Sequence, residues 1–282
     1  MLKGHNMAKK LNNFLARGAV TAEHGQYLTK MRLRKLAIWF SQFILLLFII
    51  LLWEIAANQR LIDPFITSQP SAIWQTILRL TRDGSIFYHT GITVYETVMS
   101  FVIGTVLGTL IAVLLWWSDF LSRVLDPYIV ILNSTPKIAL GPIFIVFLGD
   151  GINAIITMAL TISLIVTVVM VYTGFKEVDP NKIKLLRTFG ANKLQIMQKV
   201  IFPASVPTMI AALKVNVGMS FVGVIVGEFL VARAGLGYLI IYGQQVFQLQ
   251  LAMTSVVILI ITAGFLYQLV SYLENRFLKW KE

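Results

Sequence analysis

The chain has 282 residues, of which 57% are hydrophobic and only 13% are charged, and its net charge is +11. A soluble globular domain carries about 25% charged residues, so this composition is typical of a membrane protein. The chain contains no cysteine, which excludes disulfides, zinc–thiolate sites and iron–sulfur clusters. Its three histidines are scattered along the sequence, so a histidine metal site is not expected.

Apolar runs that could cross a membrane recur along the chain, since about 20 helical residues span a hydrocarbon core of about 30 Å. The first span is predicted over 36–57, after a basic cytoplasmic tail at 1–35. This run starts too late and is too long for a cleavable signal peptide. An interfacial helix is predicted over 71–80. The second span, at 93–117, contains Gly104-x-x-x-Gly108, a spacing that allows helices to approach closely.

A short turn is predicted over 118–126, followed by a third apolar region at 127–148. Pro136, Lys137 and Pro142 lie inside this region and predict a broken or kinked helix. Such a backbone is tolerated at membrane depth only where it is buried in protein or lines a wet cavity. The fourth span, at 152–173, contains no charged residue.

Residues 176–203 form a polar, basic segment between two apolar runs. Apolar residues recur in it at helical spacing, which predicts short amphipathic helices with a face that could dock a partner. A fifth apolar region at 205–231, a loop at 232–250 and a last span at 251–273 follow. The predicted fold class is therefore all-α, a polytopic membrane protein with six core transmembrane helices.

The positive charge lies mainly at the ends of the predicted spans. Six spans place both termini on one side of the membrane, together with the basic segment at 176–203. The positive-inside rule puts all three in the cytoplasm, so we expect a multi-pass protein of the cell membrane with cytoplasmic termini. This distribution favours topology over nucleic-acid binding, so membrane lipid is an expected partner and nucleic acid is not.

The sequence lacks a phosphate-binding loop, a His-Glu-x-x-His motif, a G-x-S-x-G motif and closely spaced carboxylates. We therefore expect no enzyme, no catalytic residue and no metal site in this chain. Ionisable residues inside spans are the candidates instead, because their burial costs about 2.5–3.5 kcal/mol. Lys137, Lys214 and Glu228 are candidate pathway residues, with Asn133 and Ser134 beside the first. Alternatively, the lysines reach an interface or pair with Glu96 or Glu228.

The basic segment resembles a known signature. Gly190, nine further residues and Val200-Ile201-Phe202-Pro203 resemble the second half of E-A-A-x-x-x-G-x9-I-x-L-P, which marks membrane subunits of binding-protein-dependent ABC importers. One departure is that Lys184-Leu185-Leu186 stands where Glu-Ala-Ala is expected. Other stretches, in order, resemble the aliphatic sulfonate, taurine and nitrate permease subgroup, and the resemblance covers about residue 40 to the C-terminus. They are Gln69-Pro70-Ser71, Leu125-Asp126-Pro127, Pro136 through Pro142, Val178-Asp179-Pro180, Val226-Gly227-Glu228 and Gly235-Leu236-Gly237-Tyr238-Leu239-Ile240.

The resemblance implies a type I ABC importer transmembrane domain at 36–282, with peripheral helices and a coupling loop at 176–203. It implies a homodimer of permease subunits, two cytoplasmic ATPase subunits that bind ATP–Mg, and an extracytoplasmic substrate-binding protein. This chain itself would hold no cofactor. Gly190 is expected to allow a tight turn between two loop helices, and Pro203 to end the second and start the next span. The implied coupling residues are Lys184, Leu185, Leu186, Arg187, Phe189, Gly190, Ala191 and Pro203.

The substrate class follows only from the resemblance and from one side chain. The subgroup implies small anions such as alkanesulfonates, taurine, nitrate or bicarbonate, and Lys137 favours an anion. The alternative substrate is a neutral heterocycle, such as a thiamine-precursor pyrimidine or riboflavin. Two other classes remain, an ATPase-independent channel or secondary carrier and a membrane enzyme. A carrier predicts coupling acids within the spans and no docking loop, and an enzyme lacks a catalytic constellation.

Overall fold

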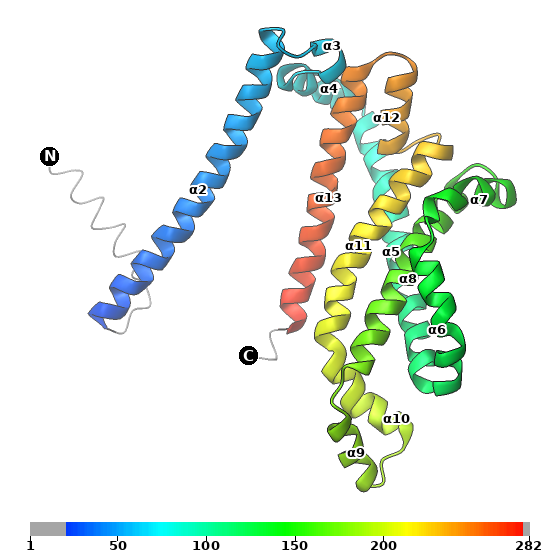
Figure 1. The fold of residues 1–282 in the computed structure, drawn as a ribbon. Coiled ribbons are helices and arrows are strands. Elements are labelled where there is room, and N and C mark those ends of the chain that lie inside the picture. Colours follow the sequence, from blue (N-terminus) through cyan, green and yellow to red (C-terminus); the bar gives the residue numbers. More distant parts are fainter. Residues whose placement is uncertain (1–20, 279–282) are drawn as a thin grey trace. The chain divides into compact units, whose positions relative to one another are not determined.

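The computed structural model describes residues 21–278, and these are almost entirely helical (Figure 1). The chain divides into two compact units, Met1–Ser71 and Ala72–Glu282. In the first unit, α2 spans Ala22–Asn58 and α3 spans Pro64–Thr67. The hydroxyl of Thr21 caps α2 by accepting a hydrogen bond from the backbone N–H of His24. The first span is therefore helical as predicted, but its helix begins inside the basic segment at 1–35. Residues 1–20 of that segment lie outside the described part.

The next helices in the chain lead to the predicted break. The interfacial helix predicted at 71–80 is confirmed as α4, which spans Pro70–Arg82, and the second span as α5, which spans Ser85–Trp117. The broken third region consists of α6 (Asp119–Ser134), a 3-10 turn η1 (Lys137–Leu140) and α7 (Gly141–Leu148). The fourth span is α8 (Ile152–Lys176).

The turn predicted at 118–126 is wrong, because these residues begin α6. The hydroxyl of Ser118 accepts a hydrogen bond of 3.1 Å from the backbone N–H of Leu121 and caps the helix. Pro127, which suggested a boundary, lies inside α6. A proline removes one backbone hydrogen bond from a helix, and the capped first turns of α6 form in spite of that loss.

The basic segment and the rest of the chain form the remaining helices. They are α9 (Pro180–Thr188), α10 (Lys193–Ile196), a π-helical turn η2 (Met197–Ile201), α11 (Phe202–Val231), α12 (Leu236–Gln245) and α13 (Leu249–Leu278). The loop predicted at 232–250 is therefore partly wrong, because it contains α12. The glycines of this stretch suggested a loop, but Leu236, Leu239 and Ile240 share one helical face and are buried.

Within residues 21–278, five helical segments are long and apolar enough to cross a membrane. They contain α2, α5, α8, α11 and α13. The pair Asp119–Ser134 and Lys137–Leu148 is bent by 90° and makes a sixth if it counts as one span. This result agrees with six predicted spans and with a break near Pro136.

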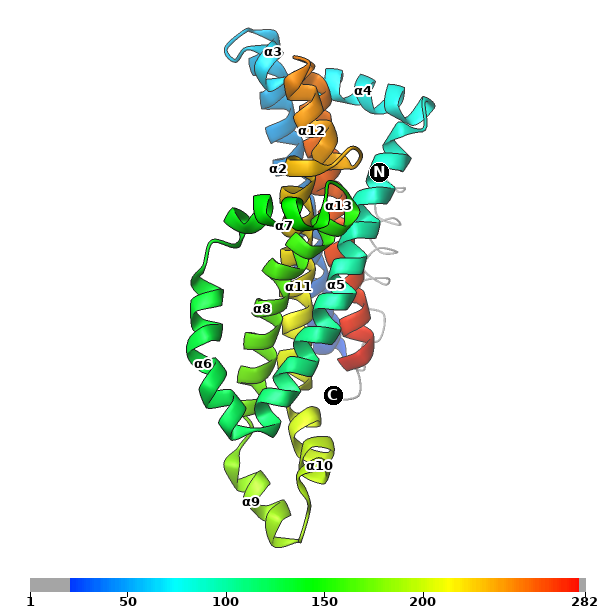
Figure 2. The same cartoon turned by 90° about the vertical axis from the view of Figure 1, so that its right-hand side faces the viewer.

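In the second unit, α8 packs against both α5 and α11, and all three run side by side (Figures 1 and 2). The close approach of α5 to α8 needs glycine, because a Cβ at Gly108 would lie 2.8 Å from the Cβ of Thr167. At Gly104 it would lie 2.8 Å from the hydroxyl of Ser163. The helix contact predicted from Gly104-x-x-x-Gly108 is confirmed.

Candidate functional site

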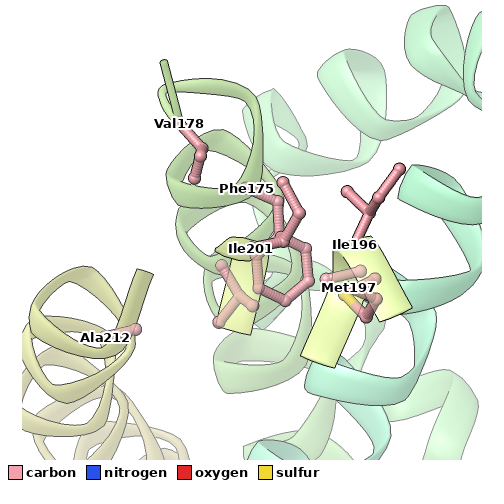
Figure 3. Packing of buried hydrophobic residues seen from close by; sticks show 8 residues of the cluster. Phe175, Val178, Ile196, Met197, Ile201 and Ala212 are labelled. Atoms are coloured by element: carbon pink, nitrogen blue, oxygen red, sulfur yellow. The ribbon is translucent and has the colours of Figure 1, made fainter. Parts of the chain in front are cut away.

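The basic segment at 176–203 forms a helical hairpin whose base is buried. Phe175 at the end of α8 packs with Ile196, Met197 and Ile201 from the far side of the hairpin (Figure 3). Phe175 is 1% exposed, and Val178 is a buried member of the same cluster. Burial of each large apolar side chain contributes about 1.5–3 kcal/mol. This cluster therefore holds the hairpin firmly against the ends of the spans.

Local hydrogen bonds define the two helices and the turn of the hairpin. The carboxylate of Asp179 accepts a hydrogen bond of 2.8 Å from the backbone N–H of Asn181 and starts α9. Asn192 and Gln195 exchange hydrogen bonds in a capping box that starts α10. Gly190 between them has φ +77, and a Cβ there would meet nothing within 4 Å. Glycine is favoured at this position by its backbone angle and not by space, which agrees with the predicted tight turn.

The predicted coupling residues of the hairpin divide into an outer and an inner set. Phe189 is 78% exposed and Leu185 is 54% exposed, and Lys184 and Arg187 are exposed beside them. Leu194 of α10 is 51% exposed and adds to this surface, which we call the hairpin tip. The inner set, Leu186 and Ala191, packs on the buried cluster.

Pro203 does not end a helix, which corrects the sequence prediction. The chain remains helical without interruption through α10, the π-turn η2 and α11. Pro203 lies in the first turn of α11 directly after the π-turn, so its missing N–H falls where the regular i−4 hydrogen-bond pattern is already interrupted. It starts the span as predicted, but no break precedes it.

Three candidate pathway residues lie together at the break of the third region. The Nζ of Lys137 donates a hydrogen bond of 3.0 Å to the backbone carbonyl of Asn133. Asn133 and Ser134 line a cavity of about 220 Å³ between α6 and α8, which Tyr172 and Lys176 also line. Polar and apolar side chains both line this cavity, and Lys137 does not line it, so the break lies next to the cavity without forming its wall.

The other two candidates lie elsewhere and have their own partners. Lys214 of α11 forms an ion pair of 2.5 Å with Glu274 of α13, and not with Glu96 or Glu228 as the structural alternative expected. No sequence pattern pointed to Glu274, because the pair depends on how α11 and α13 pack. A role of Lys214 in the pathway stays a prediction.

Glu228 is buried in a polar network near the end of α11. Its Oε1 accepts a hydrogen bond of 2.6 Å from the hydroxyl of Thr93, and its Oε2 accepts one of 2.5 Å from the N–H of Gly237. The same hydroxyl accepts a hydrogen bond of 2.8 Å from the N–H of Leu236. We call Thr93, Glu228, Leu236 and Gly237 the α12 clasp. In this structure the clasp attaches the start of α12 to α5, and Glu228 is 1% exposed.

No group of three or more metal-binding side chains that could hold an ion occurs within residues 21–278. The candidate residues lie mainly in four separate places, which are the hairpin tip, the break in the third region, the buried clasp and the ion pair of Lys214 with Glu274. The first place offers a surface for a partner and the second borders a cavity.

Comparisons with known proteins show which protein family this chain resembles. The family model described as binding-protein-dependent transport system inner membrane component matches residues 104–279. The SsuC protein of Bacillus subtilis, named as an aliphatic sulfonates transport permease, is 26% identical over 267 residues, which cover 94% of this chain and 96% of SsuC. The formylaminopyrimidine transport permease protein ThiX of Halalkalibacterium halodurans is 29% identical over 193 residues, 68% of this chain and 76% of ThiX.

Solved structures share the fold. An inward-facing structure of the MetNI methionine ABC transporter contains a chain with 25% sequence identity and a TM-score of 0.57, covering 67% of this chain and 92% of that chain. A crystal structure of an amino acid ABC transporter matches with a TM-score of 0.59 at 19% identity, over 71% of this chain and 97% of that chain. The helices thus have the arrangement of a type I ABC importer transmembrane domain. Since the family model also covers more than half of the sequence, the chain belongs to the inner membrane components of binding-protein-dependent transport systems.

Proposed function

We propose that two copies of this chain form the membrane pathway of an ATP-driven importer, and that the hairpin tip docks into a cytoplasmic ATPase subunit beneath each copy. The observation that carries the proposal is the hairpin tip itself. Leu185, Phe189 and Leu194 expose apolar surface while the base of the same hairpin is buried. Exposed apolar surface rimmed by charged residues is typical of a protein interaction site.

The charge around the hairpin tip constrains the partner. Lys182, Lys184 and Arg187 are exposed on α9, and Lys193 begins α10. Lys184 stands where the resembling family has a glutamate, so the docking groove of the ATPase would carry acidic side chains to match it. Complementary charges of this kind select one partner over another.

The remaining parts of the system follow from this placement. The ATPase subunits would bind ATP–Mg, so this chain would hold no cofactor and catalyse no hydrolysis. Basic segments at the hairpin and near both termini favour a cytoplasmic location for all three. The end of the molecule that carries α12, opposite the hairpin in Figure 1, would then face the extracytoplasmic substrate-binding protein.

We infer that the solute is a small organic or inorganic anion of the alkanesulfonate, taurine or nitrate type. Lys137 supports this inference, because its ammonium lies at the broken helix beside Asn133 and Ser134, which line a cavity between α6 and α8. The similarity to SsuC supports it independently. In an uptake assay with reconstituted importer, Lys137→Ala should lower anion uptake and Lys137→Arg should retain most of it. Unchanged uptake in Lys137→Ala would remove the lysine from the pathway.

The second candidate solute is a neutral pyrimidine, which the similarity to ThiX favours. Titration of the cognate binding protein with an alkanesulfonate and with a formylaminopyrimidine separates the two candidates. Tight binding of the pyrimidine alone would favour the second.

The docking proposal is tested by co-purification with the candidate ATPase and by substrate-stimulated ATP hydrolysis. Phe189→Asp should abolish both, because it places a charge on the apolar centre of the hairpin tip. A control is Phe87→Asp, since Phe87 is 69% exposed but lies at the start of α5. Gly190→Trp should also disrupt docking by altering the turn. If Phe189→Asp and Gly190→Trp behave like the Phe87→Asp control, the hairpin is not the coupling element and an ATPase-independent channel or carrier becomes the better reading.

A further inference from the structure

A basic groove lies at the base of the hairpin, and it shares only Arg187 with the hairpin tip. It has a volume of about 560 Å³ and lies where the ends of α5 and α8 meet the start of α6 and the hairpin (Figure 2). Three cationic side chains from three helices line it, together with the aromatic rings of two further residues. They are Lys176, Arg187, Lys193, Trp116 and Tyr172.

The groove has an excess of positive charge. Its one acidic side chain, Asp119, forms an ion pair of 2.9 Å with Arg123, which does not line the groove. Within the described part of the chain, none of the three cationic side chains forms an ion pair. Three positive charges thus face a shared space in which the only lining carboxylate is paired with Arg123.

The cations also retain hydrogen-bond donors. The Nζ of Lys193 donates to the backbone carbonyl of Trp117 and lies 5.6 Å from the ring centre of Trp116. The Nζ of Lys176 lies 4.9 Å from the ring centre of Tyr172. An ammonium has three N–H donors and a guanidinium has five, so most of them remain available to an anion with several acceptor oxygens. A phosphate group fits these requirements.

The location of the groove points to the source of that phosphate. It lies at the ends of two apolar spans, since α5 ends at Trp117 and α8 ends at Lys176. Tryptophan and tyrosine are enriched where spans meet the membrane surface. Basic pockets between transmembrane helices at this level bind anionic lipid headgroups. Ile183 and Leu115 add apolar walls that suit the first acyl carbons of a lipid better than a free ion.

We propose that this groove binds the phosphate headgroup of an anionic phospholipid. Arg187 and Lys193 belong to the hairpin whereas Lys176 belongs to α8, so a bound headgroup would connect the hairpin to the end of a span. The proposal goes beyond the coupling function and requires only that the ends of α5 and α8 lie at a membrane surface. It can therefore fail while the docking of an ATPase holds, and the reverse is also possible.

The test compares lipid binding to the purified full-length chain and to four variants, by native mass spectrometry during titration with phosphatidylglycerol or phosphatidylcholine. We expect the wild-type chain to prefer phosphatidylglycerol. Arg187→Glu should weaken that binding by at least about fivefold, the effect of one basic side chain at an anionic membrane surface. Asp119→Asn should instead strengthen it, because the variant removes the only acidic group of the groove. A folding defect would not strengthen binding.

Two further variants separate the groove from general surface charge. Lys199→Glu changes an exposed lysine of the π-turn that does not line the groove, so phosphatidylglycerol binding should stay near the wild-type value. Arg123→Ala should weaken binding, since it frees the carboxylate of Asp119. Equal losses in Lys199→Glu and Arg187→Glu would overturn the proposal.

Two other outcomes would also overturn it. One is displacement of the lipid by millimolar inorganic phosphate, which would identify a free-anion site. The other is loss of the bound lipid when the ATPase is added, which would identify the groove as part of the protein interface. Retention of phosphatidylglycerol in both cases supports the proposal.

Discussion

The α12 clasp makes a sharp prediction at Thr93. Replacement of Thr93 by valine keeps the shape of the side chain and removes its hydroxyl. That hydroxyl donates a hydrogen bond of 2.6 Å to Glu228 and accepts one of 2.8 Å from the N–H of Leu236. All of these groups are buried, so water does not replace the lost partner easily.

The magnitude follows from the N–H of Leu236, which loses its partner. A buried polar group left without a hydrogen bond costs about 1–3 kcal/mol. The carboxylate of Glu228 keeps other partners, among them the N–H of Gly237, so the clasp should weaken by about 1–3 kcal/mol. Because about 1.4 kcal/mol corresponds to a factor of ten, the lower bound predicts at least about fivefold faster opening at α12.

Hydrogen–deuterium exchange of the reconstituted protein measures this opening at the backbone amide of Leu236. Exchange there should accelerate in Thr93→Val, while amides near Phe175 at the opposite end of α8 should keep their wild-type rates. Thr93→Ser is the matched control, since it keeps the hydroxyl and loses one methyl group, worth about 0.8 kcal/mol. If Thr93→Val and Thr93→Ser protect Leu236 equally, the hydroxyl does not hold α12 and the reasoning about the clasp is wrong.

Three further predictions concern packing and charge. Phe175→Ala should destabilise the base of the hairpin by about 3–5 kcal/mol, seen as a lower thermal midpoint and faster amide exchange in α9, with Phe175→Leu as a milder control. Gly108→Ala should cost about 1–3 kcal/mol, because the new Cβ would overlap the Thr167 side chain, whereas exchange at α12 should not change. Lys214→Met should lower the thermal midpoint, because it leaves the carboxylate of Glu274 unpaired. Adding Glu274→Gln to this variant should recover part of the lost stability. A double variant no more stable than Lys214→Met alone would contradict the ion pair.

The apolar spans and the break near Pro136 could be predicted because each depends on a local pattern. Composition and length identify a span, and prolines beside Lys137 identify a backbone that cannot continue. The spacing of Gly104 and Gly108 likewise predicted a close contact between two helices. The short amphipathic helices of the basic segment were also expected, since their apolar residues recur at helical spacing.

Other features depend on packing and left no clear local pattern. The partner of Lys214 is Glu274, which lies on another helix, α13, near the C-terminus. The clasp joins Thr93 and Glu228 from α5 and α11, and the only sequence signal for it was a glutamate inside a predicted span. The helical spacing of Leu236, Leu239 and Ile240 could have predicted α12, but the neighbouring glycines favoured a loop.

The unbroken winding of the chain through α10, η2 and α11 has a mechanical consequence. A π-helical turn changes the number of residues per turn without opening the backbone, so it rotates the faces of the two parts while they stay joined end to end. With 30 residues, α11 is a rod about 45 Å long. The π-turn, Pro203 and Pro207 lie one after another at the start of this span, and prolines and π-turns are the recognised causes of bends in a helix. A displacement of the hairpin would therefore reach the span through continuous helical backbone that can bend at this point, and the part of α11 beyond Pro207 would tilt in response.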